Sequence, residues 1–154
     1  MKQVCLRWQN RYDADVNMLL FAHWQATKNI RLSTLDIENL VEKVALWRAE
    51  ILLPLRSARK GLADFRSAAT GKEYAQVSQL NHMYQEILQQ ELEAEFVQQR
   101  MMAESPLKNS QISDGSILAL TKHNLAAYLS VQGLPVQGTK QPLKELASIL
   151  SNVS

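Results

Sequence analysis

The sequence is poor in cysteine, glycine and proline, and each shortage excludes a class of protein. The 154 residues include 1 Cys, 5 Gly and 4 Pro. The single cysteine, Cys5, cannot form an internal disulfide, so the fold does not depend on an oxidising compartment. So little glycine and proline excludes a collagen-like chain, and a hydrophobic fraction of 46% excludes wholesale disorder.

Long apolar runs are missing as well. The longest purely apolar run covers residues 18–22, far short of the ~20 residues needed to span a bilayer. No charged start followed by an apolar segment marks a secretory signal at the N-terminus. We therefore expect a cytoplasmic protein without a membrane partner, built as one ordinary domain with at most a small appendage.

The composition that is present favours helices throughout. Leu, Ala, Gln and Glu are abundant, whereas β-branched runs are few. The fold class expected is all-α: an irregular helical bundle with one long helix, followed by a small C-terminal helix-extended-helix unit. The boundaries expected are 1–104 for the bundle, which we also expect to self-associate, 105–116 for a linker and 117–154 for the C-terminal unit.

Hydrophobic periodicity and capping residues locate the helices. Residues 16–26 are apolar nearly all round, which is typical of a central buried helix, with Asp15 as its N-cap. Ser33 marks a second helix start. Pro54 interrupts the apolar stripe that follows, and it either kinks one long helix or opens a new one. Residues 73–103 form the longest candidate helix, and Ser105 with Pro106 ends it.

The formal net charge of +2 hides three blocks of alternating sign. Residues 1–72 carry 12 basic and 7 acidic side chains, residues 73–104 carry one arginine against six glutamates, and residues 105–154 carry four lysines against two acids. The acidic block can pack against a basic block or remain a solvated helix face.

Motifs for catalysis or metal binding are absent, and the sequence therefore predicts no catalytic residues, metal ligands, cofactor or small-molecule substrate. Asp13, Asp15 and Asn17 imitate the start of a calcium loop, but the loop's glycine and glutamate positions hold Met18 and Trp24. The three histidines, His23, His82 and His123, lack a metal-binding spacing. A small polar enzyme site among Arg11, Asp13, Asp15, Asn17 and His23 is a remote alternative.

Residues 120–150 carry the clearest functional signal. They indicate a helix capped by Thr121 and ended by a left-handed Gly133, then an extended connector, then a helix that begins beside Lys140. Free N–H groups at that helix start, Gly138, the Thr139 hydroxyl and the Lys140 ammonium would converge on one point. Such a point suits a phosphate group.

This segment resembles the SAP domain, a helix-extended-helix module that binds DNA. The resemblance lies in Leu120-Thr121, Leu125, Leu129, Gly133-Leu134-Pro135, Gly138-Thr139-Lys140 and Leu143, about a fifth of the chain. It implies nucleic-acid contacts from Thr121, Lys122, His123, Gly138, Thr139, Lys140 and Lys144.

A second resemblance covers roughly residues 4–66, which look like a proteobacterial family of short helical proteins of unknown function. The residues that carry it are Cys5-Leu6, Arg11-Tyr12, Asp15-Val16-Asn17, Leu19-Leu20-Phe21, Trp24, Trp47-Arg48 and Pro54-Leu55-Arg56. It implies a helical fold and a bacterial source but no activity.

Basic residues of the first block share one edge of the helical run. They are Arg48, Arg56, Arg59, Lys60 and Arg66. They either form a second phosphate-binding surface or pair with the glutamates of residues 86–95.

Together these features predict a DNA-binding regulatory or nucleoid-associated protein. In this hypothesis the C-terminal unit grips the DNA backbone in a salt-sensitive way, and a homodimer formed by the N-terminal helices raises the avidity. The alternative is a non-enzymatic helical adaptor that binds proteins.

Overall fold

The computed structural model describes residues 7–9, 14–68, 77–134 and 140–151. These residues form six α-helices and a two-stranded antiparallel sheet, which confirms the expected all-α class. The chain divides into two compact units. We call residues 1–42 with 104–154 the terminal unit, and residues 43–103 the hairpin unit. None of the described helices is both long and apolar enough to cross a membrane.

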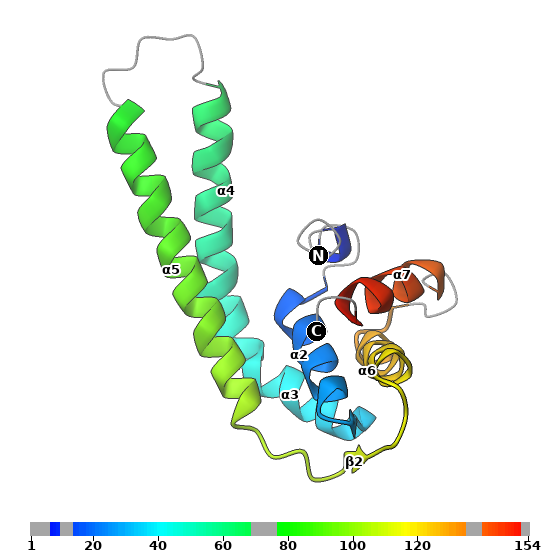
Figure 1. The fold of residues 1–154 in the computed structure, drawn as a ribbon. Coiled ribbons are helices and arrows are strands. Elements are labelled where there is room, and N and C mark those ends of the chain that lie inside the picture. The colour runs from blue at the N-terminus through cyan, green and yellow to red at the C-terminus, as the bar shows by residue number, and fades with distance from the viewer. Residues whose placement is uncertain (1–6, 10–13, 69–76, 135–139, 152–154) are drawn as a thin grey trace. The chain divides into compact units, whose positions relative to one another are not determined.

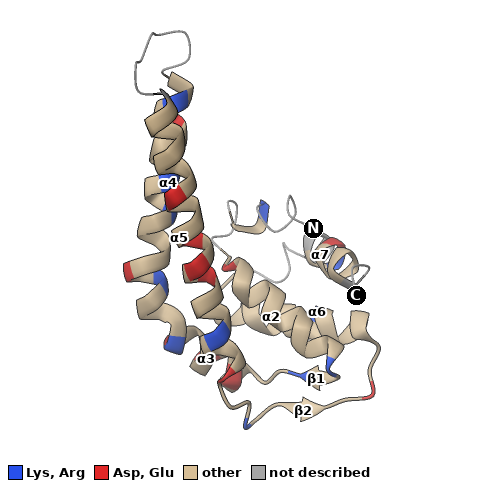
Figure 2. Ribbon diagram, turned by 60° about the vertical axis from the view of Figure 1, so that its left-hand side comes forward, with Lys and Arg blue, Asp and Glu red and all other residues tan. Residues whose placement is uncertain are grey.

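The terminal unit is built around helix α2 (Val16–Thr27), which contacts α6 (Ile117–Val131) and α7 (Lys140–Ser151). Helix α2 contains no Lys, Arg, Asp or Glu, and α6 contains only Lys122 (Figure 2). Such helices are stable only when covered on several sides. The covered side chains come from all three helices and include Leu19, Leu125, Tyr128 and Leu146. The predicted central buried helix is therefore confirmed.

Local signals in the terminal unit act largely as predicted. The buried carboxylate of Asp15 caps α2 by accepting a hydrogen bond from the Asn17 N–H at 2.9 Å. The Ser33 hydroxyl accepts from the Asp36 N–H at 3.0 Å, where α3 (Thr34–Trp47) begins. Gly133 has φ of 67° and ends α6, and the Leu134 N–H donates to the Leu129 carbonyl at 3.0 Å. This is the six-residue hydrogen bond of a Schellman cap.

The expected linker at residues 105–116 is wrong, because these residues form part of the terminal unit. Strand β2 (Gln111–Ile112) pairs antiparallel with β1 (Ile30–Arg31), with Ile30 opposite Ile112. The carboxylate of Asp36 accepts hydrogen bonds from the backbone N–H and side-chain amide of Asn109, each at 2.9 Å, and from the Ser110 hydroxyl at 2.7 Å. A turn-rich composition reports backbone conformation and does not report whether the backbone is anchored.

The predicted division into 1–104 and 117–154 is wrong for a related reason. Helix α6 does not form a separate unit with α7, because its apolar stripe covers α2. Closing a loop of some 90 residues costs little more entropy than closing one of 45, since the cost grows only with the logarithm of length. The burial available between α2 and α6 outweighs that cost.

The hairpin unit is an antiparallel pair of helices (Figure 1). A π-helical segment, η1 (Arg48–Leu52), follows α3 and leads directly into α4 (Leu53–Ala68), which lies against α5 (Val77–Ala103). Pro54 is the second residue of α4, and the residues on both sides of η1 have right-handed helical dihedral angles. The helix therefore continues past Pro54, and the wider π turn accommodates a ring that has no N–H to donate.

Candidate functional site

Asn124, on α6, holds the centre of a buried polar network in the terminal unit. Its side-chain oxygen accepts a hydrogen bond from the Leu32 N–H at 2.8 Å, and its amide nitrogen donates to the carbonyls of Ala22 and Ile30, each at 3.0 Å. The side chain is completely buried. The side-chain amide of Asn124 thus joins α6 to α2 and to the segment that contains β1. Each of its three partners is a backbone group, so the bonds fix the main chains of these segments relative to one another.

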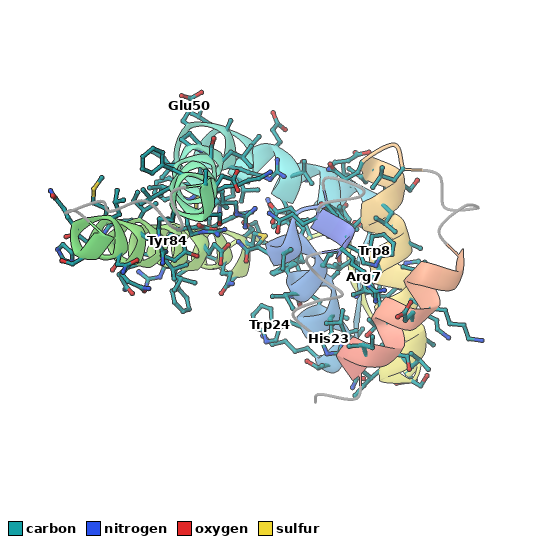
Figure 3. All side chains as sticks on the ribbon, turned by 90° about the horizontal axis from the view of Figure 1, so that it is seen from above. Arg7, Trp8, His23, Trp24, Glu50 and Tyr84 are labelled. Atoms are coloured by element: carbon teal, nitrogen blue, oxygen red, sulfur yellow. The ribbon has the colours of Figure 1, made fainter. Side chains whose placement is uncertain are left out.

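Thr121 lies in the same network and not on the surface. Its side chain is fully buried, and its hydroxyl lies 3.0 Å from Nδ1 of His23. Figure 3 labels His23 on α2. The N-cap of α6 is instead Ser116, whose hydroxyl accepts from the Ala119 N–H at 3.3 Å. The prediction of Thr121 as a helix cap is therefore wrong, and so is its expected position at a phosphate contact, because its side chain packs inside the unit. Burial lowers the pKa of His23.

His123 is held against strand β1. Its Nε2 lies 3.1 Å from Nε of Arg31 and 3.3 Å from the Leu32 carbonyl. Burial lowers the pKa of His123, the charge of Arg31 lowers it further, and the Leu32 carbonyl opposes both. A neutral ring whose Nε2 accepts from Arg31 fits the shorter contact, and the same nitrogen then does not donate to the Leu32 carbonyl. His123 therefore adds no positive charge to this surface at neutral pH.

The remaining nucleic-acid candidates of the C-terminal segment are less constrained. Lys144 is exposed on α7, and Lys122 is half-buried on α6. Gly138 and Thr139 lie outside the described residues, and so does the side chain of Lys140, the first residue of α7. Two lysines of the expected phosphate site are therefore placed on the terminal unit.

The second predicted basic surface is largely neutralised within the hairpin unit. Arg59 forms a two-pronged hydrogen-bonded ion pair with Glu91, and Arg56 binds Glu95 at 2.6 Å and Glu91 at 3.5 Å. These side chains are between 7% and 30% exposed. The bond to Glu91 raises the pKa of Arg59, so this guanidinium stays charged throughout the physiological range. The pairing alternative is thereby confirmed for Arg56 and Arg59.

Three other members of that basic set lie on the same unit. The Arg66 guanidinium lies over the ring of Tyr84, 5.0 Å from its centroid, on the α4 side of α5 (Figure 3). Lys60 is exposed on α4, and Arg48 is half-buried in η1. The five cations therefore do not form one solvent-facing patch.

The opposite flank of the hairpin has no charge along α4. Phe65 follows Arg56 by nine residues and Val97 follows Glu95 by two, so at 100° per residue each lies about 160–180° around its helix from that ion pair. Because Arg56 and Glu95 meet on one flank, Phe65 and Val97 lie on the other. Six α4 residues share this flank within an arc of about 120°: Pro54, Leu55, Ala58, Gly61, Leu62 and Phe65.

Helix α5 continues the same flank. Met83, Gln90 and Val97 recur every seven residues, which aligns them along one line of the helix. Phe65, Met83 and Val97 are 51%, 43% and 41% exposed. We call the six α4 residues named above, with Met83, Gln90 and Val97, the Phe65 flank of the hairpin. It is uncharged on α4, whereas on α5 the exposed Glu86 and Glu93 lie about 20–40° around the helix from Val97 and border it. Sequence reasoning missed this flank, although a helix projection of residues 53–68 already gathers every charge of α4 on other sides.

No described group of three His, Cys, Asp or Glu side chains is arranged to hold a metal ion. Asp15 and His23, two of the residues considered for a small enzyme site, have the capping and hydrogen-bonding roles given above. Arg11 and Asp13 lie outside the described residues.

The described residues define an all-α protein with one unit made by a helical hairpin and one unit made from both ends of the chain. The chain belongs to the family described as Protein of unknown function (DUF2390), whose model matches residues 1–102. Helices α6 and α7 lie outside this match, and no family match supports the SAP resemblance. No curated protein matches the chain. No solved structure matches it either.

Proposed function

We propose that this is a non-enzymatic protein-interaction protein whose contact surface is the Phe65 flank of the hairpin. The observation that carries the proposal is that Phe65, Met83 and Val97 are 41–51% exposed on a flank where α4 has no charged residue. Apolar patches with large side chains and little charge are typical of the centres of protein interfaces. The basic candidates, by contrast, are paired or buried in several cases.

A photo-crosslinking amino acid placed at position 65 tests this proposal in living cells. The matched control carries the same amino acid at Lys60, which is exposed on the same helix but on another side. We expect discrete crosslinked products from position 65 that are missing from position 60. Identical products from both positions, or none from position 65, would contradict the proposal.

DNA binding is a second candidate, favoured by one observation. Helix α6, its left-handed end at Gly133 and the start of α7 at Lys140 follow the order that the SAP resemblance implies, and Lys144 is exposed on the second helix. In this candidate the protein is a regulatory or nucleoid-associated DNA-binding protein that contacts the backbone through Lys122, Lys140 and Lys144.

Duplex DNA titrated at low and moderate salt tests this candidate with point variants of the full chain. Truncation is unsuitable because α6 covers α2. We expect Lys140→Glu and Lys144→Glu to weaken binding and to reduce its salt dependence, whereas Lys108→Glu, an exposed lysine of the same unit, has no such effect. Equal binding by all three variants would refute it.

A further inference from the structure

We propose that strand β2 is a docking edge for an extended peptide segment of a partner protein, which adds to the β1–β2 pair as a third, antiparallel strand. This site lies in the terminal unit and is separate from the Phe65 flank, so it goes beyond the function proposed above. It is carried by the hydrogen-bonding pattern of the sheet, the exposure of Ile112, the anchoring of β2 and the charges beside the strand.

The register of the sheet turns the backbone groups of Ile112 away from β1. The Ser113 N–H donates to the Asn29 carbonyl at 2.8 Å, so these two residues form a hydrogen-bonded pair of the antiparallel ladder. Because hydrogen-bonded and non-hydrogen-bonded pairs alternate, Ile112 and Ile30 form the next, non-hydrogen-bonded pair. The N–H and C=O of Ile112 therefore point to the outer edge of β2, and within the described residues neither has a hydrogen-bond partner.

The opposite edge of the sheet is closed within the chain. The Asn124 side-chain amide accepts from the Leu32 N–H at 2.8 Å and donates to the Ile30 carbonyl at 3.0 Å, as the backbone of a neighbouring strand would. In Figure 2, β1 lies between β2 and α6. Of the two edges of this sheet, the β2 edge is therefore the one that the described part of the chain leaves unpaired.

The side chain of Ile112 adds an apolar contact beside these backbone groups. It is 84% exposed, and the half-buried side chain of Ile30 lies next to it on the same face of the sheet. An extended segment can cover Ile112 with a residue directly opposite and also pair with its N–H and C=O. A helix cannot, because its backbone groups are bonded within the helix. An extended main chain is therefore the occupant that fits this edge.

Strand β2 is held in place without a partner. The carboxylate of Asp36 binds Asn109 and Ser110 before the strand, and the bond from Ser113 to Asn29 follows it. A partner strand therefore has little disorder to remove from this edge, which favours binding. Because β2 is only 2 residues long, we expect the complex to be weak and reversible.

The charges beside β2 indicate the composition of the partner segment. Residues 111–113 are uncharged, whereas the exposed Lys108 precedes them and the exposed Asp114 follows them. Opposite charges stabilise a strand pair and like charges destabilise it. We therefore expect an antiparallel partner with uncharged central residues, a basic residue at its N-terminal end and an acidic residue at its C-terminal end.

A second copy of residues 108–114 has the same order of charges, but its β2 is part of a folded unit. Two folded copies that meet along two-residue strands share an edge only about 7 Å long. This edge is far too short for the roughly 1,200 Å² of a specific interface between folded proteins. A free peptide segment can continue along the surface beyond the strand, so it is the better occupant.

A synthetic peptide, acetyl-Lys-Thr-Val-Thr-Val-Thr-Glu-amide, titrated into the isotope-labelled full chain tests the proposal by NMR. We expect saturable binding that slows solvent exchange of the Ile112 amide at least tenfold, while the Ser113 amide, already bonded to Asn29, changes little. The same peptide with its three central residues N-methylated should bind at least tenfold more weakly. No binding up to about 1 mM, or equal binding of both peptides, overturns the proposal. Slowed exchange at Ile112 that depends on protein concentration without peptide also overturns it, in favour of a second copy.

Variants of the full chain test the backbone groups directly. Ile112→Pro removes the outward N–H but keeps the Ser113 bond to β1, so the chain should remain folded by circular dichroism and bind the peptide at least tenfold more weakly. Leu35→Thr is the matched control, because Leu35 is 52% exposed on α3 in the same unit, and it should bind normally. Phe65→Glu should also bind normally, which separates this site from the Phe65 flank. Normal binding by a folded Ile112→Pro variant, or an equal loss from Leu35→Thr, overturns the proposal.

Discussion

Asn124 allows a quantitative test of the terminal unit. Replacing it with Leu keeps the approximate volume but removes hydrogen bonds to three backbone groups, the Leu32 N–H and the carbonyls of Ala22 and Ile30. Each bond contributes about 1 kcal/mol net, and a buried group left unsatisfied costs about 1–3 kcal/mol. We therefore expect Asn124→Leu to lower the free energy of unfolding by about 3–5 kcal/mol, a large part of the ~5–15 kcal/mol typical of a domain.

The assay must report the terminal unit alone. The chain has three tryptophans, and in a Trp47→Phe background the remaining two, Trp8 and Trp24, both belong to the terminal unit. Urea unfolding followed by tryptophan fluorescence then gives the free energy of unfolding by linear extrapolation. Ser130→Ala, an exposed position on the same helix, serves as the control and is expected to change stability by less than about 0.5 kcal/mol.

A second substitution at this position sharpens the test. Asn124→Asp keeps an acceptor for the Leu32 N–H but points carboxylate oxygen at two carbonyls 3.0 Å away. It should therefore destabilise strongly at pH 7 and less at low pH, where a protonated carboxyl can donate one hydrogen bond. A loss below about 1 kcal/mol for Asn124→Leu, or a pH-independent effect of Asn124→Asp, would show that the three bonds do not contribute as the geometry implies.

Three further predictions concern charged groups. Glu91→Gln should lower the stability of the hairpin unit by about 2–4 kcal/mol, because two largely buried guanidinium groups lose their shared carboxylate. Urea unfolding followed by Trp47 fluorescence in a Trp8→Phe and Trp24→Phe background measures this loss, and a change within experimental error would contradict it. The lowered pKa values of His23 and His123 mean that the unfolded chain binds more protons below the ordinary value of 6.5, so stability should be full above that pH and fall as the pH drops below it. Urea unfolding between pH 8 and 5 checks the sign, and His123→Gln should flatten the slope. Burial raises the pKa of Asp36, but its hydrogen bonds outweigh burial and lower the pKa below the ordinary value of 3.8. The stabilisation by Asp36 should therefore persist above pH 3.8 and disappear under stronger acid. Asp36→Asn should remove this acid-dependent part of the stability in circular-dichroism melts.

Features encoded by neighbouring residues could be predicted from the sequence. Asp15 caps α2 and Gly133 ends α6 because each acts on backbone groups within a few residues of itself. The apolar residues on nearly all sides of α2 likewise predicted a central buried helix. The pairing of arginines on α4 with glutamates on α5 was one of the two alternatives that the sequence left open. It could be considered because Arg56 and Glu91 lie in sequence blocks of opposite net charge.

Features that depend on long-range packing could not be predicted in this way. Nothing local to Asn109 or Ser110 indicates that both bind Asp36, some 73 residues earlier in the chain. Thr121 has the residue type of a helix cap, yet the cap of this helix is Ser116, five residues earlier, and the Thr121 hydroxyl lies inside the unit beside His23. The candidate surface changed for the same reason: the side on which a helix is covered depends on its neighbours, and Phe65 is 51% exposed in the folded chain.

The construction of one unit from both ends of the chain affects how the protein is made. Helix α2 ends at residue 27, but α6, which covers it, ends at residue 131. At about 5–20 residues per second, synthesis of the intervening hundred residues takes about 5–20 s. The hairpin, whose contacts are local, can fold during this delay. During this delay the apolar surface of α2 is exposed, because α6 has not yet been synthesised. We therefore expect nascent α2 to bind a chaperone, and ribosome-bound chains that end before α6 to aggregate or to recruit one.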